Sequence, residues 1–531
     1  MSPTHPPLML SESGYWLKTF CGCLLEFSFL QHSYTVMKQL DRAINLERGS
    51  TMPTIKREQW SRHFGKWFRR ILIEAGIMDY RYPVKGMAVW LPYGFKIRRN
   101  MLQTLRSLLD ATGHNEMLFP LLIPEASLAK ESEHMKNFEG QVFWITKGGL
   151  TDLDVKLALR PTSETVIAPM LKLWIRSHAD LPLKMYQIVN VFRYETKATR
   201  PLIRMREVDN FKEAHTVHAT EAEADAQIKE AIEIYKKFFD TAAAPYKMTK
   251  RPVWDKFAGA EYSIAFDQIL PDGRVLQSGT VHKLGQKFSK AFSVTYETEK
   301  GDREYVWQTC YGISGRPIVG MLAAHGDDNG AVLPPTMAPT QVVIIPIPFK
   351  GMEKEIDEAC QAVADSLRKA DIRTEFDRRE NVTPGAKYYY WELRGVPLRV
   401  EIGPRDLKQG QVMIVRRDTM EKQACKMDDT PKVVKETIKT MMENMKQKAW
   451  QWMNEHVHRV GSLDEAKRLT KHKAGIVEVL WCGNAECGHK LEAETEASVL
   501  GTPEDSEEKA KGKCVVCGKN AEDILRLAIA Y

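Results

Sequence analysis

The sequence contains no long apolar run. Its hydrophobic stretches all fall short of the roughly 20 residues that a membrane-spanning helix needs, so we expect no membrane span. The first 50 residues carry four bases and four acids, which argues against a transit peptide. Lys18 and Glu26 interrupt the apolar part near Cys21, which argues against a signal peptide. We interpret residues 1–50 as an N-terminal extension of unknown role.

Cysteine is sparse, and most of it is scattered. There are nine cysteines in 531 residues. Five of them (Cys21, Cys23, Cys310, Cys360 and Cys425) are scattered outside the C-terminal cluster, which is typical of cytosolic thiols and not of a disulfide framework. The sequence thus favours a cytoplasmic protein. The glycine patterns of a P-loop or a Rossmann fold are also missing, so neither of those nucleotide sites is expected.

Composition sets broad limits. Hydrophobic residues make up 43% and charged residues 27% of the chain, as in globular proteins. The length predicts roughly three or four domains. A net charge of +7 is compatible with nucleic-acid binding but does not show it.

Periodicity predicts an α+β protein of several domains. Residues 60–75 and 95–111 have the apolar stripes of amphipathic helices, and residues 116–123 read as a strand that carries Pro120. Thr220 and Glu223 form a capping box before another helix. Residues 51–335 are therefore predicted to be one domain, which ends at a Leu-Pro-Pro boundary.

The rest of the chain divides in two. From residue 341 the sequence alternates strand and helix, which predicts a small α/β domain with a largely parallel core over residues 336–435. A helical stretch over 431–457 leads into a last unit, 436–531, that contains a cysteine cluster.

Residues 191–215 (VFRYETKATRPLIRMREVDNFKEAH) predict a strand, a basic loop and a second strand. Arg193 and Glu195 are two apart, so in a strand they share one face. A guanidinium for a phosphate and a carboxylate for an amine together suit ATP. The alternative is a hairpin with a solvated charged tip.

Five segments in this order resemble the class II aminoacyl-tRNA synthetases, and the prolyl-tRNA synthetase family of the archaeal and eukaryotic type in particular. Helix 95–111 with strand 116–123 resembles motif 1, residues 191–211 motif 2, and GISGRPIVG at 312–320 motif 3. Arg160-Pro-Thr-Ser-Glu164 and Gln277-Ser-Gly-Thr-Val-His282 match signatures of the prolyl family. The resemblance covers the chain from about Trp60 to Tyr531. It implies a class II antiparallel sheet with helices, then an α/β anticodon-binding domain and a C-terminal α/β zinc-binding domain.

The chain departs from the family pattern in small ways. The family usually has two hydroxyl residues before the motif 3 arginine, whereas this chain has Ser314 and Gly315. The interval from Glu213 to Gln277 leaves no room for the large editing insertion of the bacterial type. Lys287-Phe-Ser-Lys290 looks like half of the class I synthetase signature, but its His-x-Gly-His partner is missing, so we interpret it as a helix start or loop.

The resemblance implies a two-step reaction. Proline and ATP give prolyl-adenylate, and tRNA(Pro) then takes the prolyl group. Alignment and charge stabilisation should carry the catalysis. Arg193 and Arg316 are the expected catalytic residues. The expected ATP-binding residues are Arg193, Glu195, Gln277, Thr280, Ser314 and Arg316, with Mg²⁺ bridging the phosphates.

The proline pocket must hold a secondary ammonium on a small apolar ring. By resemblance its residues are Thr162, Glu164, Arg193, Phe211, Glu213, His215 and His282. Thr162 and Glu164 could instead cap a helix, the histidines could be hydrogen-bonded core residues, and Phe211 could be core. Because apolar size discrimination gives only ~1–3 kcal/mol per methylene, misactivation of cysteine or alanine is expected.

Two further sites are predicted. Arg399, Glu401 and Arg405, in RVEIGPRD, could read guanine edges of the anticodon, the alternative being a solvated strand face. Cys482, Cys487, Cys514 and Cys517 are spaced C-x4-C and C-x-x-C, with a glycine after three of them that permits the tight turns of a metal knuckle. This pattern predicts structural Zn²⁺ held by four thiolates. Two disulfides, free thiols or a role for His489 are the alternatives. In the family the terminal carboxylate folds back towards the active site, and we expect the same of Tyr531.

The resemblance therefore implies a homodimeric ATP-dependent enzyme that joins proline to tRNA, with tRNA(Pro), ATP and L-proline as its partners. One alternative is a synthetase-like tRNA-binding protein without activity. The presence of the catalytic set argues against it. Another is a sister class IIa enzyme for a different amino acid. The two prolyl signatures argue against that.

Overall fold

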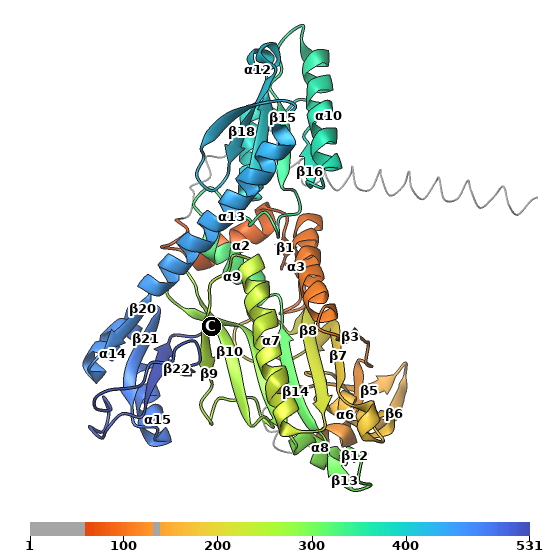
Figure 1. The fold of residues 1–531 in the computed structure, drawn as a ribbon, viewed down its shortest axis with the longest axis vertical. Helices are drawn as coiled ribbons and strands as arrows, with labels where there is room; N and C mark the ends of the chain where they lie inside the picture. The colour runs from red at the N-terminus through yellow and green to blue at the C-terminus, as the bar shows by residue number, and fades with distance from the viewer. Residues whose placement is uncertain (1–58, 131–138) are drawn as a thin grey trace, which may run out of the picture. The chain divides into compact units, whose positions relative to one another are not determined.

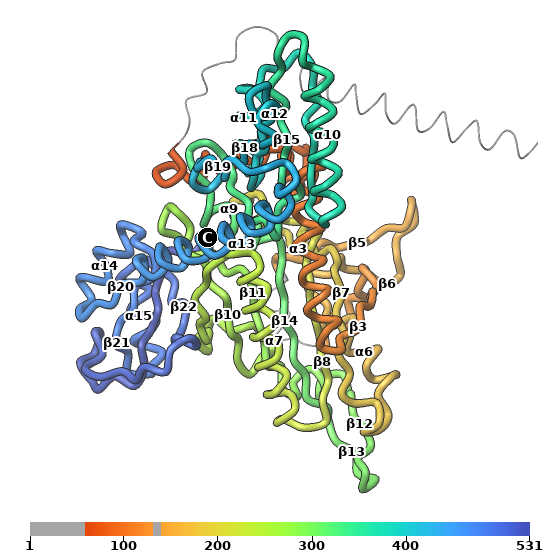
Figure 2. Tube along the Cα trace, turned by 45° about the horizontal axis from the view of Figure 1, so that its top comes forward, coloured from red at the N-terminus to blue at the C-terminus, as the bar shows by residue number. Residues whose placement is uncertain are grey.

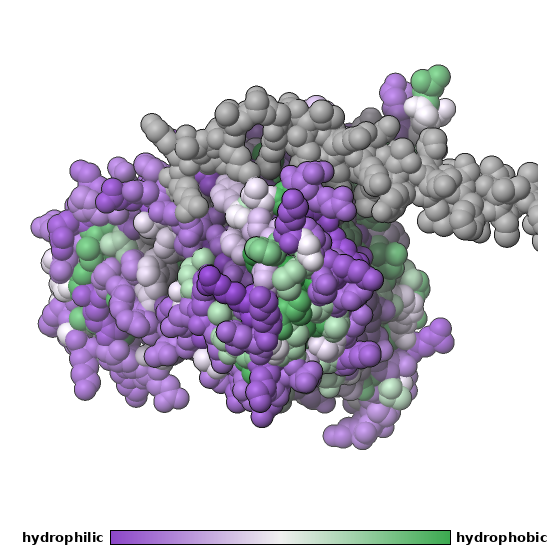
Figure 3. Space-filling model, turned by 90° about the horizontal axis from the view of Figure 1, so that it is seen from above, coloured by the Kyte–Doolittle hydropathy of each residue, from purple (hydrophilic) through white to green (hydrophobic). Residues whose placement is uncertain are grey.

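The computed structural model describes residues 59–130 and 139–531 (Figure 1). The predicted extension, residues 1–50, lies outside the described residues. Within the described part, no helix combines the length and the apolar character that crossing a membrane requires. Figure 3 shows that hydrophilic side chains cover most of the described surface on one face.

The organising element is a sheet of eleven strands in the order β20-β21-β23-β22-β9-β10-β11-β14-β8-β7-β3. From β22 to β7 all neighbours are antiparallel. The strands on the N-terminal side are β3 (Asn115–Glu116), β7 (Leu183–Phe192), β8 (Glu207–His218), β9 (Lys247–Lys250), β10 (Tyr262–Ile269), β11 (Val275–Gly285) and β14 (Trp307–Ile313).

Helices cover one face of this sheet. Helix α7 (Glu221–Thr241) begins at the predicted capping box, in which Thr220 Oγ1 accepts from the Glu223 backbone at 3.2 Å. Its apolar side packs against β8, β11 and β14 (Figure 1). The largest core cluster joins α7 to three more helices: α2 (Phe64–Glu74), α3 (Pro92–Asp110) and α9 (Arg316–His325).

Smaller elements surround the sheet. A three-stranded sheet, β4-β6-β5, lies beside α6 (Glu164–Trp174). The remaining elements of this part are β1 (Met78–Asp79), β2 (Val89–Trp90), β4 (Leu122–Pro124), α4 (Glu125–Ala129), β5 (Phe143–Gly148), β6 (Thr151–Leu159), α8 (Lys287–Phe292), β12 (Thr295–Glu297) and β13 (Arg303–Tyr305).

Two sequence predictions need correction here. The predicted strand 116–123 is two short strands, β3 and β4, because the segment between them, which holds Pro120, leaves the ladder. The helix expected at 95–111 begins at Pro92, since proline at the first helical position gives up an amide that would be unpaired anyway. The interpretation of 287–290 as a helix start is confirmed by α8.

The next part has its own five-stranded sheet, β16-β15-β17-β18-β19 (Figure 2). Only the β15–β16 and β15–β17 pairs are parallel, so the largely parallel core that we predicted is a mixed sheet. Its last strand was missed because its sequence, KQACK, is polar and mostly exposed. The elements are β15 (Val342–Pro346), α10 (Glu353–Lys369), β16 (Thr374–Phe376), α11 (Pro384–Leu393), β17 (Leu398–Ile402), α12 (Pro404–Gln409), β18 (Gln411–Arg416) and β19 (Lys422–Lys426).

The C-terminal part completes the large sheet. Thr502 and Pro503 of β22 pair with Lys250 and Thr249 of β9, so the sheet runs without a break from the last part of the chain into the first. The predicted α+β class is thereby confirmed. The C-terminal elements are α13 (Thr430–Glu455), β20 (Val457–Val460), α14 (Leu463–Lys471), β21 (Ile476–Trp481), α15 (Ala485–Thr495), β22 (Ser498–Pro503) and β23 (Asp523–Ala528).

Candidate active site

Strand register places several of the predicted site residues on the face of the sheet opposite α7. One row across the strands holds Thr280, Gly312, Glu213 and Gln187, since each pairs directly with the next. Alternate residues of a strand share a face. The row two residues along therefore faces the same way, and it holds His282, Cys310, His215 and Met185.

The Phe211 ring lies close to Gly312 on the neighbouring strand β14. A Cβ on Gly312 would lie 3.0 Å from the tip of the Phe211 ring, which is tighter than ordinary van der Waals contact. The glycine therefore lets this ring approach β14 closely. That Phe211 forms a wall of the pocket stays a prediction.

Glu213 is buried in a polar network. Its Oε1 accepts from the Ser163 hydroxyl and from Gln187 Nε2, the latter at 2.8 Å. Its Oε2 is buried without a hydrogen-bond partner and lies 3.6 Å from His215 Nε2. Glu213 thus keeps one oxygen that a ligand can use.

The Thr162–Glu164 segment starts α6. Thr162 Oγ1 donates to Glu164 Oε2, and both side chains are buried. The N-cap residue is Ser163, which makes no side-chain capping bond and donates to Glu213 instead. The helix-capping alternative for Thr162 and Glu164 is therefore not what this geometry shows. Instead, the Thr162 hydroxyl and the Glu164 carboxylate lie in contact with each other.

Arg193 lies just beyond the end of β7, although the sequence predicted it within that strand. β7 ends at Phe192, so Arg193 and Glu195 do not share a strand face. The chain turns because the Glu195 amide donates to the Arg193 carbonyl at 2.7 Å, a bond between residues two apart. Arg193 Nε donates to the Pro161 carbonyl at 3.1 Å. Burial lowers the pKa of Arg193, and the carboxylates of Glu195, Glu164 and Glu213 oppose that shift.

Arg316 begins α9 and faces the same region. Its Nε donates to the Ile203 carbonyl and its Nη1 to the Gln277 carbonyl, each at 2.9 Å. The pKa of this arginine falls to about 10 because it is buried, with further contributions from Arg193 and Arg204. Three guanidinium groups thus concentrate positive charge where a polyphosphate would be stabilised.

Gln277, Thr280 and Ser314 lie half-buried around Arg316. Gln277 Oε1 accepts from Arg251 Nη2 at 2.8 Å, and Ser314 Oγ accepts from the Arg316 amide at 3.3 Å.

Glu195 contacts Arg204 at 3.4 Å, and the same arginine donates to a terminal oxygen of Tyr531 at 3.1 Å. The Tyr531 hydroxyl donates to Asp272 at 2.6 Å, and its ring lies 4.7 Å from the Arg200 guanidinium. The end of the chain is therefore placed beside the loop between β7 and β8.

His282 is buried against two neighbours. Its Nδ1 lies 2.8 Å from Ser263 Oγ, and its ring lies 4.8 Å from that of Phe257. Burial lowers the pKa of His282 to about 4, so the imidazole is neutral at pH 7.

Sequence reasoning missed several residues that hold this site. Gln187 orients Glu213, and Arg251 orients Gln277. Arg160 donates to the carbonyls of Asn190 and Phe119, which fixes the segment before α6. Cys310 lies between His215 and His282. The alternation of β14 could have placed it on the site face, but a cysteine in an apolar strand gives no signal of its own.

The four C-terminal cysteines meet at one point. Their Sγ atoms all lie within 4.8 Å of one another, and two of the separations are 3.6 and 3.7 Å. A disulfide needs about 2.05 Å, whereas tetrahedral zinc with bonds of about 2.3 Å spaces its thiolates by about 3.8 Å. The cluster therefore fits Zn²⁺ and not two disulfides.

Of the three glycines that follow a cysteine of the cluster, two have the backbone conformation of a tight turn, as predicted. Gly483 and Gly518 have φ of +77° and +73°. Gly488 does not form a turn: it lies within α15, where a Cβ would come 2.5 Å from the Trp254 ring. His489 is exposed, its ring lies 4.6 Å from the Trp254 ring at a tilted angle, and it is not part of the thiolate cluster.

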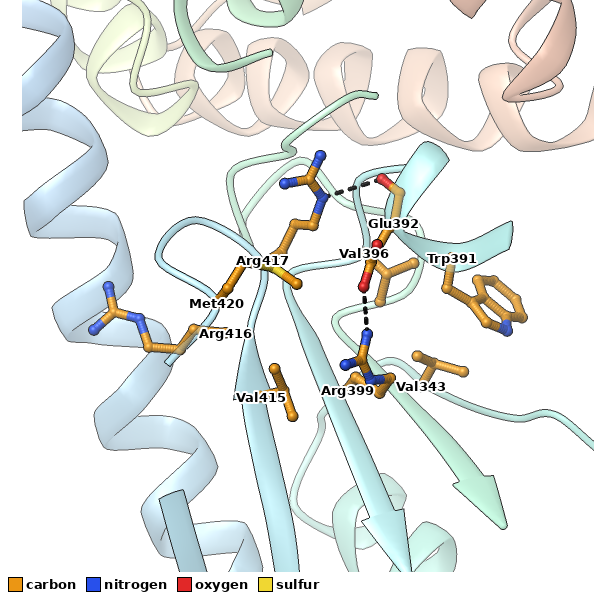
Figure 4. A pocket seen from close by; sticks show the side chains of 9 residues that line it. All are labelled: Val343, Trp391, Glu392, Val396, Arg399, Val415, Arg416, Arg417 and Met420. Carbon is orange, nitrogen blue, oxygen red and sulfur yellow. Dashed lines mark hydrogen bonds and ion pairs between the residues drawn. The ribbon is translucent and has the colours of Figure 1, made fainter. Parts of the chain in front are cut away.

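The predicted anticodon residues differ in exposure. Arg399 and Glu401 are buried and joined at 2.8 Å, and Arg399 also pairs with Glu392 at 2.7 Å (Figure 4). The neighbouring cavity, about 10 Å³, has room only for a water molecule. Arg405, at the start of α12, is exposed. Reading of a base by Arg399 or Glu401 thus requires their ion pair to open, whereas Arg405 is free to approach RNA.

An antiparallel sheet with arginines at the ends of β7 and β14 defines the class of this protein. Residues 143–325 match the family model of the tRNA synthetase class II core domain (G, H, P, S and T), and residues 341–437 match that of the anticodon binding domain. The protein is a class II aminoacyl-tRNA synthetase. Residues 463–531 match the C-terminal domain model of prolyl-tRNA synthetase.

Individual proteins narrow the family. The chain is 54% identical to a proline--tRNA ligase of Methanopyrus kandleri over 88% of its own length and 96% of that protein. It is 53% identical to that of Ignicoccus hospitalis over 88% and 98%. A solved structure, Giardia lamblia prolyl-tRNA synthetase in complex with prolyl-adenylate, superposes with a TM-score of 0.86 at 37% identity, over 89% of this chain and 99% of that one. The chain therefore belongs to the prolyl-tRNA synthetase family, as the sequence motifs predicted.

Proposed function

We propose that this chain attaches L-proline to tRNA(Pro) at the expense of ATP, through a prolyl-adenylate. The observation that carries the proposal is the placement of Thr162 and Glu164 beside Arg193. A hydroxyl and a carboxylate suit the ammonium of an amino acid, and the guanidinium suits its carboxylate. Family membership supports proline as that amino acid.

In the first step a proline carboxylate oxygen attacks the α-phosphorus, and pyrophosphate leaves. Arg193 holds the carboxylate and the α-phosphate, while Arg316 holds the γ-phosphate end. Both guanidinium groups are fixed by backbone carbonyls, so they need little reorganisation as charge develops. Glu195 accepts from the adenine amine. Gln277, Thr280 and Ser314 line the ATP side.

In the second step a ribose hydroxyl of the tRNA attacks the prolyl carbonyl, and AMP leaves. Neither step uses a protein nucleophile. Mg²⁺ bound to ATP would neutralise phosphate charge. Within the described residues, neither group of three or more potential metal ligands is an oxygen-only set of the kind Mg²⁺ prefers, so we propose no protein ligands for it.

Phe211, Glu213, His215 and His282 complete the pocket in this proposal. The neutral His282 adds no charge that would repel the ammonium. Cysteine and alanine are small enough to enter, so we propose that both are misactivated at a low rate.

The zinc proposal concerns structure alone. Cys482, Cys487, Cys514 and Cys517 would hold one Zn²⁺, which stabilises the C-terminal part of the sheet. Metal analysis of purified protein should find one zinc per chain that a chelator removes with a fall in Tm; zinc-free protein of unchanged Tm would refute this.

We further propose a homodimer formed through motif 1. Leu118 is 80% exposed, and the neighbouring Leu121 and Leu122 are also exposed, so this segment offers apolar surface that a second copy would cover. Light scattering should give a dimer that Leu118→Glu converts to a monomer. A monomeric unmodified protein would exclude the proposal.

Contact of the 336–435 region with the anticodon also remains a proposal, through Arg405 and, once their ion pair opens, Arg399 and Glu401. Arg405→Ala should raise KM for tRNA several-fold without changing pyrophosphate exchange.

The deciding experiment is amino-acid-dependent ATP–pyrophosphate exchange with proline, cysteine, alanine and threonine. Exchange should be strongest with proline and should fall by about 10²–10³ in Arg193→Ala, the range found when one charge-stabilising donor is lost. The exposed Arg303→Ala is the matched control. Folded, zinc-loaded protein without exchange for any of these amino acids would favour the inactive tRNA-binding alternative.

A further inference from the structure

A second potential metal site lies inside the proline pocket. Glu164, His215 and Cys310 come from three elements, α6, β8 and β14, and each is at most 5% exposed. One ligand atom of each lies within 4.8 Å of the other two. Cys310 is the direct cross-strand partner of His215, so the backbone register itself brings the thiol and the imidazole together.

The spacing fits a small, soft cation. Cys310 Sγ lies 3.3 Å from Glu164 Oε1 and 3.9 Å from His215 Nε2. Ligands around a tetrahedral zinc ion, at about 2.3 Å for sulfur and 2.0 Å for nitrogen or oxygen, are about 3.5 Å apart. The two observed distances bracket that value, and the ligand atoms of the third pair, Glu164 and His215, lie within 4.8 Å of each other.

Two buried carboxylates face the pocket. Glu164 and Glu213 lie near three cations: Arg193 acts on both of them, and Arg160 and Lys212 act on Glu213. Glu213 Oε2 is buried without a hydrogen-bond partner, 3.6 Å from His215 Nε2. A divalent cation that displaced the Cys310 thiol proton would add a net charge of one, because the thiolate offsets the other.

The proposed aminoacylation leaves Cys310 without a task. Burial and the nearby Glu164 and Glu213 raise the pKa of its thiol well above the ordinary value, so it is a neutral, weak donor to Glu164. A metal ion would change that, because a coordinated thiol is deprotonated outright.

We propose that Glu164, His215 and Cys310 bind a soft divalent cation of the zinc type, and that this cation competes with proline. On binding, the Cys310 proton passes to solvent and the sulfur becomes a thiolate ligand, with water in the fourth position. Competition follows because Glu164 would serve both the metal and the proline ammonium. Mg²⁺ would not bind, since it prefers oxygen ligands in octahedral geometry.

Only the competition rests on the proposed function. Metal binding itself depends on three side chains and can be measured without substrate. A failure of the proposed function would therefore leave the metal site testable, and a failure of the metal site would leave the proposed function testable.

The probe is Co²⁺, added to full-length protein whose C-terminal cluster already holds zinc. We expect one further ion per chain, with a thiolate-to-cobalt charge-transfer band that saturating proline abolishes. The band should disappear in Cys310→Ser and persist in Cys360→Ser, a control at another fully buried cysteine, on α10. If Cys310→Ser unfolds in a thermal scan, His215→Gln provides the same comparison.

Exchange assays give the functional result. Zinc should inhibit competitively with proline and not with ATP, and its inhibition constant should rise at least tenfold in Cys310→Ser. A cobalt band unchanged by Cys310→Ser, or no second ion in active enzyme, would overturn the metal site while leaving the proposed function intact. A Cys310-dependent band in protein without exchange activity would support the site and count against the proposed function.

Discussion

At the scale of single residues, the pocket depends on small side chains as much as on charged ones. Gly312 leaves room for the Phe211 ring, and Gly315 lies against Asn210 in the same way, since a Cβ there would come 2.8 Å from the amide. Glycines at such positions let a neighbouring side chain come close, but they take no part in the chemistry. Only the surrounding motif, and not the residue type, therefore indicates that they belong to the site.

Gly312→Ala tests the role of Phe211. The new methyl group should push the ring into the pocket and raise KM for proline roughly tenfold, which corresponds to about 1.4 kcal/mol, while KM for ATP stays within twofold. Steady-state exchange kinetics measure both constants. Gly65→Ala is the control, because nothing lies within 4 Å of a Cβ there. Equal changes in both KM values would count against a specific effect on the ring.

Buried histidines make stability depend on pH. Burial lowers the pKa of His114, His218 and His282 to about 4. The ordinary value is about 6.5, so between pH 6.5 and 4 the unfolded chain binds the proton first. The free energy of unfolding must therefore fall as pH falls through that window, by up to about 1.4 kcal/mol per pH unit for each such group.

His218→Gln tests this dependence away from the active site. Its Nε2 lies 2.8 Å from Thr216 Oγ1, a contact that glutamine can retain. Urea midpoints at pH 7.5 and 5 should differ less in this variant than in the parent. If the urea midpoints of the variant differ as much as those of the parent, or more, then the burial of a neutral His218 does not contribute to the pH dependence of stability.

Individual site residues were predictable only in part. The motifs brought Thr162, Glu164, Arg193 and Arg316 to attention, and the structure brings all four to one region. The supporting residues Gln187 and Arg251 were not predictable, because a glutamine and an arginine in strands or loops are common. Strand register, which depends on the whole sheet, gives them their partners.

At the scale of elements, the loop between β9 and β10 contacts both the four-cysteine cluster region and the candidate pocket. Trp254 packs against Gly488 and His489, next to Cys487, while Phe257 three residues on packs against His282. The Trp254 Nε1 atom is buried without a hydrogen-bond partner, so the indole is held by packing.

Trp254→Ala should loosen this loop. We expect KM for proline to rise several-fold, with KM for ATP unchanged, because Phe257 contacts His282, a residue of the proposed proline pocket. Val253→Ala is a matched control, since that side chain is 72% exposed in the same loop. A Trp254→Ala enzyme with unchanged KM for proline would show that the loop is fixed by other contacts, such as that of the Phe257 amide with Ser263.

Element prediction succeeded where periodicity was strong. Helices α7 and α10 and strands β7 and β8 follow from alternation and capping within the sequence. The break between β3 and β4 and the polar strand β19 did not, because both depend on tertiary pairing that overrides local preference. The predicted end of β7 was wrong for the same reason. The strand ends at Phe192, so Arg193 lies in a turn and not in the strand.

At the scale of the whole molecule, one buried arginine, Arg417, joins the part with the five-stranded sheet to the segment after α9. Arg417 donates to both oxygens of Asp327 at 2.6 and 2.7 Å, and its Nε donates to the Glu392 carbonyl at 3.1 Å (Figure 4). Asp327 comes two residues after α9, the helix that Arg316 begins. Glu392 also pairs with Arg399. A continuous series of polar contacts therefore leads from the predicted anticodon residues to the motif 3 helix.

Arg417→Met should separate the two steps of the reaction. The variant keeps the apolar stem, so exchange without tRNA should stay within twofold, whereas kcat for aminoacylation should fall by tenfold or more. Arg416→Met is the control, because Arg416 pairs with Asp418 in its own turn. Parallel losses in exchange and aminoacylation would indicate general destabilisation, and no loss in either would exclude this path.

Domain organisation was inferred from composition and boundary residues, and the limits 51–335, 336–435 and 436–531 remain predictions. The Leu-Pro-Pro segment and the cysteine spacing were informative because proline and metal ligands act locally. The junction of β9 with β22 was not predictable, since nothing in either strand specifies a partner so distant in sequence.

That junction has a consequence for the order in which the chain folds. The strand β9 pairs with the nearby β10, but Lys250 must wait for Thr502, about 250 positions later, before β9 gains its second neighbour. Closing so long a loop is slow relative to local contacts. Until it closes, β9 is an edge strand with unpaired amides, open to pairing with another chain. Nascent or truncated molecules should therefore be the aggregation-prone species of this protein, and chaperones that shield strand edges should matter most late in its synthesis.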